Sequence, residues 1–204
     1  MITHIANTLS FNAPDAFWIW LFPVTYLIHM TEEYGGGFSA HLSKTRGFSL
    51  TSLRFFSISA AGLVLMIVGI VLAERFKFPQ LLLVIYGAAV FTNGLSHAVS
   101  GAMKGEYNPG LVTGVLLWVP QGALTLARLT GTMSGGRLLT GIVIGIGVQL
   151  SATLLSLSGG RVSEPRGAER SAESVRAARD TTLLLLILCL NCYMLIKYSG
   201  WLRG

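Results

Sequence analysis

The chain has 204 residues, of which 52% are hydrophobic and only 12% are charged, and its formal net charge is +6. A soluble domain usually carries about 25% charged residues. Nine of the 24 charged residues lie in residues 161–180, so the remainder is almost free of charge. The composition therefore indicates a polytopic membrane protein and excludes a soluble domain. Since the basic residues stand in loops between apolar stretches, the positive charge does not indicate nucleic-acid binding.

The apolar stretches predict an all-α fold with six transmembrane helices, each about 20 residues long. They cover residues 15–34, 52–73, 81–102, 110–129, 138–157 and 181–198. The segment FSAHLSK, after the first stretch, is expected to form a short interfacial helix. Residues 1–157 form a helical membrane domain, residues 158–180 a polar Arg/Glu-rich linker, and residues 181–204 a C-terminal transmembrane helix with its tail. Five spans with a peripheral C-terminal helix is the alternative, because the last stretch follows a long polar linker.

The first stretch is polar at its C-terminal end, where it carries His29, Glu32 and Glu33. Side chains three and four residues apart lie on the same face of an α-helix, so both carboxylates are expected near the His29 imidazole. Ionisable groups at a membrane boundary are costly unless they pair, bind an ion or exchange protons. This segment is therefore the main candidate for a functional site. The alternative to a functional site is a His/Glu salt bridge that caps a polar pocket and has only a structural role.

The third stretch differs from the others because small residues dominate it, in the segment GAAVFTNGLSHAVSGA. Small residues let helix backbones approach closely, so this helix is expected at the centre of the bundle. Asn93 and His97 lie four residues apart, on one face of it. One span separates the first and third stretches, so both run in the same direction across the membrane. Their polar ends, together with Tyr107 in the next turn, are therefore expected at one membrane face.

Three motifs follow one another along the chain: His29-x-x-Glu32-Glu33, Asn93-x-x-x-His97 and Tyr107-x-Pro109-Gly110-x-x-Thr113. Together they resemble the HXXEE-motif family, small bacterial integral membrane proteins named for the first motif. The match covers the first four apolar stretches. The resemblance implies a helical fold in the bacterial inner membrane and a metal-dependent enzyme, and it supplies no substrate.

The orientation follows from the charges of the loops. The side of the polar cluster holds nine basic residues and the opposite side six, and five of the nine belong to the linker. The positive-inside rule therefore predicts that the site opens at the cytoplasmic face.

In the fifth stretch, Gly141-x-x-x-Gly145 offers a close-packing face and is a candidate interface for a homodimer.

Two imidazoles and two carboxylates make a suitable ligand set for Zn²⁺, Fe²⁺ or Mn²⁺. We therefore expect a divalent metal bound by ligands drawn from His29, Glu32, Glu33 and His97. If three of these groups bind the metal, the fourth, Glu33 or Glu32, would be the general base for a metal-activated water. Asn93 would orient a ligand or donate to an oxyanion, and Tyr107 could do likewise.

Three classes of function are consistent with these residues. The first is a membrane-embedded, metal-dependent hydrolase whose lipid-like or amphiphilic substrate enters from the membrane lipid. The second is a metal-free enzyme of the isomerase kind, in which a Glu/His pair moves protons. The third is a transporter or ligand-binding membrane protein for a small solute or ion, which the short chain without an inverted repeat disfavours. Metal content separates the first class from the second.

Overall fold

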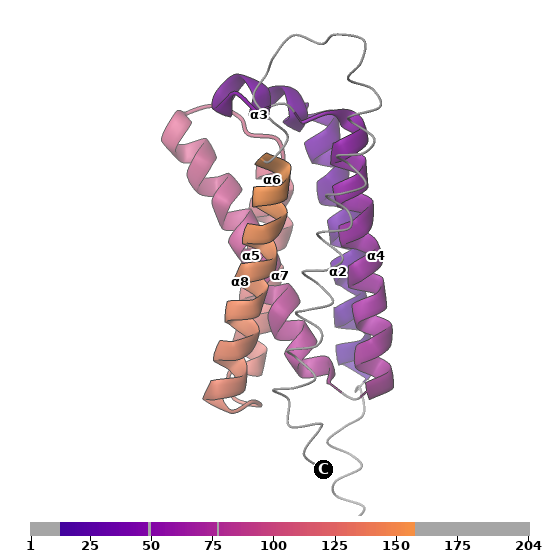
Figure 1. Cartoon of the computed structure of the whole chain (residues 1–204). Helices are drawn as coiled ribbons and strands as arrows, with labels where there is room; N and C mark the ends of the chain where they lie inside the picture. The colour runs from indigo at the N-terminus through magenta and orange to yellow at the C-terminus, as the bar shows by residue number, and fades with distance from the viewer. Residues whose placement is uncertain (1–12, 49, 77, 158–204) are drawn as a thin grey trace, which may run out of the picture.

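The computed structural model describes residues 13–48, 50–76 and 78–157, and the elements of this part of the chain are all helices (Figure 1). The fold class predicted from the sequence is therefore confirmed for the described residues. The predicted linker and the sixth apolar stretch, residues 158–204, lie outside them.

The helices follow the predicted apolar stretches closely, and each end differs from the prediction by three residues at most. In chain order they are α2 (Ala13–Gly35), α3 (Phe38–Arg46), α4 (Ser52–Phe76), α5 (Pro79–Lys104), α6 (Leu111–Thr113), a π-helical turn (Gly114–Trp118), α7 (Val119–Leu129) and α8 (Gly135–Leu157). The short interfacial helix expected from FSAHLSK is α3. Apolar runs of this length leave no alternative to a helix, because a bilayer offers backbone groups no other partners.

Four of the described helical segments are long and apolar enough to cross a membrane: α4, α5, the run from Leu111 to Leu129, and α8. The first helix, α2, is as long as α8 but is not among them, because tryptophans, prolines and its polar end lower its mean hydropathy. The predicted count of six spans is therefore not confirmed, whereas four described segments have the length and composition of membrane-spanning helices.

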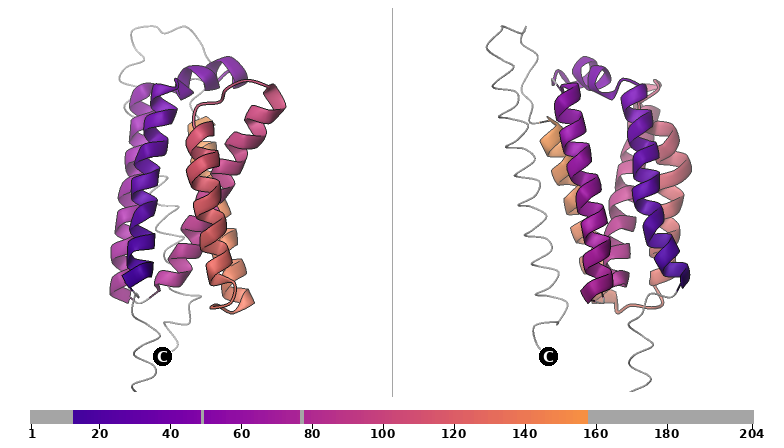
Figure 2. Two further views of the ribbon diagram at one scale, coloured as in Figure 1. Left: turned by 180° about the vertical axis from the view of Figure 1, so that it is seen from behind. Right: turned by 90° about the vertical axis from the view of Figure 1, so that its right-hand side faces the viewer.

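The small-residue helix α5 is the centre of the bundle and packs against both α7 and α8 (Figures 1 and 2). On the side of α7, a Cβ at Gly94 would lie 2.6 Å from the carbonyl oxygen of Gly114. On the side of α8, a Cβ at Gly141 would lie 2.6 Å from the side chain of Val84. The helix backbones therefore approach as closely as the glycines allow.

The second contact corrects one prediction from the sequence. Gly141 and Gly145 are buried against α5 of the same chain, where Gly145 faces Ile85 and Ala88. They therefore do not provide a free interface for a homodimer. The sequence showed a close-packing face but not its partner, since small-x-x-x-small pairs serve within a chain as well as between chains.

The helix that follows α5 is not regular along its length. Its π-helical turn, Gly114–Trp118, comes directly before Val119 and Pro120. Proline has no backbone N–H to donate, and such positions often contain a kink or a wider turn. The helix is therefore irregular just before Pro120, and Trp118 of this turn is among the buried residues of the bundle.

The short helix α3 crosses the end of the bundle where α2 ends and α4 begins (Figures 1 and 2). Its Leu42 packs with Phe55 of α4 and Leu155 of α8. Arg54, one of the nine basic residues assigned to the side of the polar cluster from the sequence, is buried, and its Nη2 donates to the carbonyl oxygen of Leu155 at 2.6 Å. This basic group satisfies a carbonyl at the end of α8 and is not a free surface charge.

Candidate metal centre

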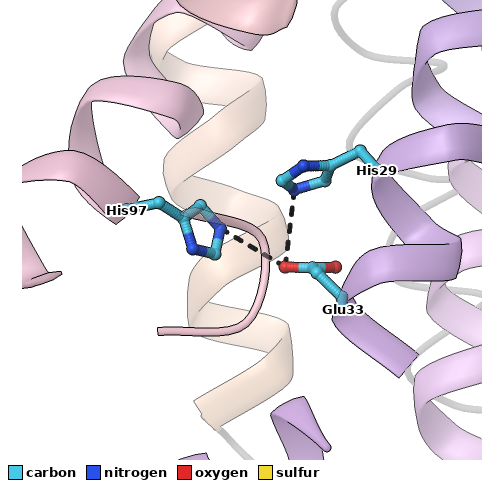
Figure 3. Close-up of side chains that lie close together, drawn as sticks. All are labelled: His29, Glu33 and His97. Carbon is cyan, nitrogen blue, oxygen red and sulfur yellow. Dashed lines mark ion pairs between the residues drawn. The ribbon is translucent and has the colours of Figure 1, made fainter. Parts of the chain in front are cut away.

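Two helices bring three of the predicted site residues together at the end of the bundle that α3 covers. His29 and Glu33 lie one turn apart on α2, and His97 comes from α5 (Figure 3). The Glu33 Oε1 lies 3.6 Å from His29 Nε2 and 3.3 Å from His97 Nε2. All three side chains are buried, and one ligand atom of each lies within 4.8 Å of the others. This is the geometry of a group that could hold a metal ion.

Glu32, the fourth predicted ligand, is turned away from this group and binds the start of the helix that follows α5. Its carboxylate accepts hydrogen bonds from the Thr113 N–H (2.7 Å), the Thr113 hydroxyl, the Val112 N–H (3.0 Å) and the Tyr107 hydroxyl (2.9 Å). The first N–H groups of a helix have no partner within it, and they attract a negative charge. Glu32 therefore joins α2 to this helix.

The same network determines the tautomer of His29. The Thr113 hydroxyl has one proton, which it donates to Glu32, so at His29 Nδ1, 2.7 Å away, it can only accept. His29 Nδ1 therefore carries a proton, and in the neutral ring Nε2 presents a lone pair to the group. That Nε2 is buried and has no hydrogen-bond partner in the part of the chain that the structure describes. A histidine held through one nitrogen by a carboxylate network, with the other nitrogen available, is typical of a metal ligand.

The turn before α6 approaches both imidazoles. Asn108 to Leu111 form a β-turn closed by a 2.9 Å hydrogen bond from the Leu111 N–H to the Asn108 carbonyl oxygen. Pro109 stands at the second position and Gly110, with φ +91°, at the third, as in a type II turn. A Cβ at Gly110 would lie 2.7 Å from His97 Cε1 and 2.9 Å from His29 Cε1. Only glycine satisfies both the turn and the space between the rings.

The other predicted site residues take separate places. Tyr107 contacts Glu32 and not the three-residue group. Partial burial and the Glu32 carboxylate raise the pKa of the Tyr107 phenol, so it keeps its proton and acts as a donor. Asn93 lies one turn before His97 and lines a cavity beside the group. The structure thus unites His29, Glu33 and His97 and leaves Asn93 in the cavity wall. Glu32 is linked to His29 through Thr113, and Tyr107 binds Glu32.

Two residues of this arrangement were not among the predicted site residues. Thr113 connects His29 to Glu32, and its place in the third motif, three residues after Gly110, was the available signal. Trp118 stacks on the His29 ring with 3.7 Å between ring centroids. No pattern in the sequence pointed to Trp118, because the π-helical turn determines where its side chain lies.

The cavity beside the group has a volume of about 290 Å³. Helix α3 contributes His41 and Thr45 to its wall, and α5 contributes Asn93 and Ser96. Further hydroxyl and amide side chains of α8 face them: Gln149, Thr153 and Ser156. The three-residue group is therefore next to a chamber at one end of the bundle, large enough for a small polar group. We call it the polar chamber for these side chains, although apolar side chains form the larger share of its wall.

The comparisons with known proteins give a family but no function. No curated protein and no solved structure matches the chain. A family model matches residues 20–125, which include all three motifs and every residue of the group described above. That stretch is more than half of the chain, and the chain therefore belongs to the family described as "Protein of unknown function with HXXEE motif".

Proposed function

We propose that the protein is a membrane-embedded, metal-dependent enzyme, a hydrolase of an amphiphilic substrate, with His29, Glu33 and His97 as metal ligands. One observation carries the proposal: the buried His29 Nε2 has no hydrogen-bond partner among the described residues and lies 3.6 Å from the Glu33 carboxylate, which also faces a second imidazole. A buried acceptor without a donor is destabilising, and a cation would satisfy it together with the Glu33 charge.

The donor set fits this role. Two imidazoles and one carboxylate are the ligands of several hydrolytic zinc sites and of non-haem iron sites. A divalent cation held there would supply Lewis acidity and a water of lowered pKa. Burial of all three ligands between α2 and α5 keeps the site in a low-dielectric environment, where charge interactions are strong.

The protein's own residues provide orientation and proton transfer. Glu32 and Thr113 hold the His29 ring in one tautomer. Glu33 directs Oε1 toward both imidazoles and leaves Oε2 pointing away from them (Figure 3), so Oε2 is free to accept a proton from water. Polar side chains of the adjoining chamber, Asn93 among them, would bind the polar part of the substrate.

The first experiment is elemental mass spectrometry of the detergent-purified full-length protein, supplied in turn with Zn²⁺, Fe²⁺ and Mn²⁺. We expect near-stoichiometric metal in the wild type and its loss in Glu33→Gln and His97→Ala, because each substitution removes one ligand. Glu74→Gln, at the exposed far end of α4, and His41→Ala, in the cavity wall, should keep the metal. Wild-type protein that takes up none of the three metals would rule out the proposed metal centre.

A metal-free acid–base enzyme is the second candidate, and a specific distance favours it. His97 Nε2 lies 3.3 Å from Glu33 Oε1, close enough for the two side chains to share a proton directly. In that case Glu33 and His97 would exchange protons with a substrate in the chamber, and the isomerase class would follow. Metal-free wild-type protein with an unaltered fold would favour this candidate.

The Thr113 hydroxyl offers a test of the tautomer argument. Thr113→Val leaves the His29 Nδ1–H without an acceptor, so we expect metal affinity to fall roughly 10- to 100-fold. Thr113→Ser should restore it. Thr140→Val is the matched control, since the exposed Thr140 hydroxyl bonds only to Gly136 of its own helix. The measurement is metal titration of purified protein, and an unchanged dissociation constant for Thr113→Val would contradict the assigned tautomer.

A further inference from the structure

A second cavity, of about 150 Å³, adjoins the polar chamber on the side away from α3. Its walls come mainly from α4, α5 and α8, with Leu65, Ile85 and Val148 among the apolar side chains. Five residues line both cavities: Tyr26, Ile58, Trp118, Gln149 and Ala152. The polar chamber and the apolar cavity are therefore neighbours with a common wall.

The apolar cavity extends along the bundle toward the middle of the membrane. Its wall on α4 runs from Ile58 to Gly69, which in an α-helix corresponds to about 16 Å. The hydrocarbon core of a bilayer is about 30 Å thick, so this depth is about that of one leaflet. On α5 and α8 the lining residues likewise lie farther from the α3 end than those of the polar chamber.

The two tyrosine hydroxyls at the cavity wall are already paired, and the buried Trp118 Nε1 is a polar atom there without a hydrogen-bond partner among the described residues. Tyr26 donates its hydroxyl proton to the Ser59 carbonyl oxygen at 3.1 Å, and Tyr86 donates to the Met66 carbonyl oxygen at 2.7 Å. Both tyrosines span the distance to α4. A Cβ at Gly62 would lie 2.6 Å from the Tyr26 hydroxyl, so α4 accommodates this ring with a glycine. With its hydroxyls bound, the wall offers a ligand mainly carbon, and water would find few partners there.

We propose that this cavity binds one hydrocarbon chain of the substrate while the polar head of the same molecule occupies the chamber beside His29, Glu33 and His97. The assignment rests on the proposed function and narrows its substrate class to amphiphiles that insert a single chain. An α-helix of another protein is about 10 Å wide and would not fit a cavity of this volume. The common wall joins head and tail sites into one binding site.

The test uses palmitic acid that carries a photoreactive diazirine on its terminal carbon. The probe is added to purified full-length protein in lipid nanodiscs, irradiated, and located by peptide mass spectrometry. We expect labelling on the cavity-facing residues of α4, α5 and α8, near Leu65, Ile85 and Val148, and competition by palmitate but not by butyrate. Val148→Trp should fill the cavity and reduce this labelling at least tenfold.

Val143→Trp is the matched control, because it makes the same substitution in α8 at a side chain that is 60% exposed and lines neither cavity. A second pair, Ala152→Phe with the exposed Ala60→Phe as control, covers the case in which Val148→Trp does not fold. Labelling that lies only on exposed positions such as Val143, or that Val148→Trp and Ala152→Phe both leave unchanged, would overturn the tail site.

Metal content, measured on the same preparations, separates the two proposals. Cavity labelling in protein that binds no metal would support the tail site and contradict the metal-dependent enzyme. Bound metal without cavity labelling would support the metal centre and contradict the tail site. Val148→Trp should lose the label and keep the metal, since Val148 contacts the tail cavity and not the three ligands.

Discussion

Gly110→Ala is expected to reduce metal affinity roughly 100-fold or more, although the substitution adds only one methyl group to a residue that is not a ligand. The methyl carbon would lie 2.7 Å from His97 Cε1 and 2.9 Å from His29 Cε1, well inside van der Waals contact. Both rings belong to buried side chains of packed helices, so they cannot retreat without moving α2 or α5. The substitution therefore changes two ligands together.

Backbone strain alone would also make this variant less stable, because alanine at φ +91° costs about 1–2 kcal/mol. Gly105→Ala separates strain from displacement of the ligands. Gly105 has φ +62°, and a Cβ there would meet nothing within 4 Å. We expect it to lose a similar amount of stability and to keep its metal affinity. If the two variants bind metal equally well in titration, the turn does not position the imidazoles.

Gly94→Leu is expected to destabilise the whole bundle by at least about 3 kcal/mol, since overpacking at a close contact forces backbones apart. A Cβ at Gly94 would lie 2.6 Å from the Gly114 carbonyl oxygen and 3.0 Å from Val119 Cγ2. A carbonyl oxygen moves only with its helix, so α5 and the π-helical turn would have to separate. Trp118, which stacks on His29, belongs to that turn.

The free energy of unfolding can be measured by titrating the detergent-purified protein with sodium dodecyl sulfate and following its helical signal. Gly147→Leu is the control, because Gly147 is exposed on α8 and a Cβ there would meet nothing within 4 Å. Leucine has the better helix propensity, so this control should be neutral or slightly more stable. A Gly94→Leu variant as stable as the Gly147→Leu variant would show that the close α5 contact is dispensable.

The helices could be predicted from the sequence because their cause is local. A run of about 20 apolar residues has one favourable structure in a bilayer, and prolines and glycines indicate its ends. The small residues of α5 likewise indicated a central helix before any contact was known. The order of spans then indicated that the polar ends of α2 and α5 share one face, where His29, Glu33 and His97 meet.

The sequence could not predict which of Glu32 and Glu33 would face the imidazoles. Spacings of three and four residues both bring a carboxylate close to His29, so helix geometry treats the two alike. The choice depends on Thr113, about 80 residues later in the chain, whose N–H and hydroxyl bind Glu32 and leave Glu33 to the imidazoles. Stacking of Trp118 on His29 likewise depends on tertiary packing.

The composition of α2 affects the order in which the helices can assemble in a membrane. This helix carries His29 and Glu33, yet it is not among the four described segments that are apolar enough to cross a membrane alone. For α2 to cross a bilayer, later helices would have to stabilise it, through the Glu32 contact with Thr113 and the hydrogen bond from Tyr26 to α4. The contacts that enclose the candidate metal ligands come from α5 and from the helix after it, which includes Thr113 and Trp118. We therefore expect the site to assemble only after these helices have joined α2.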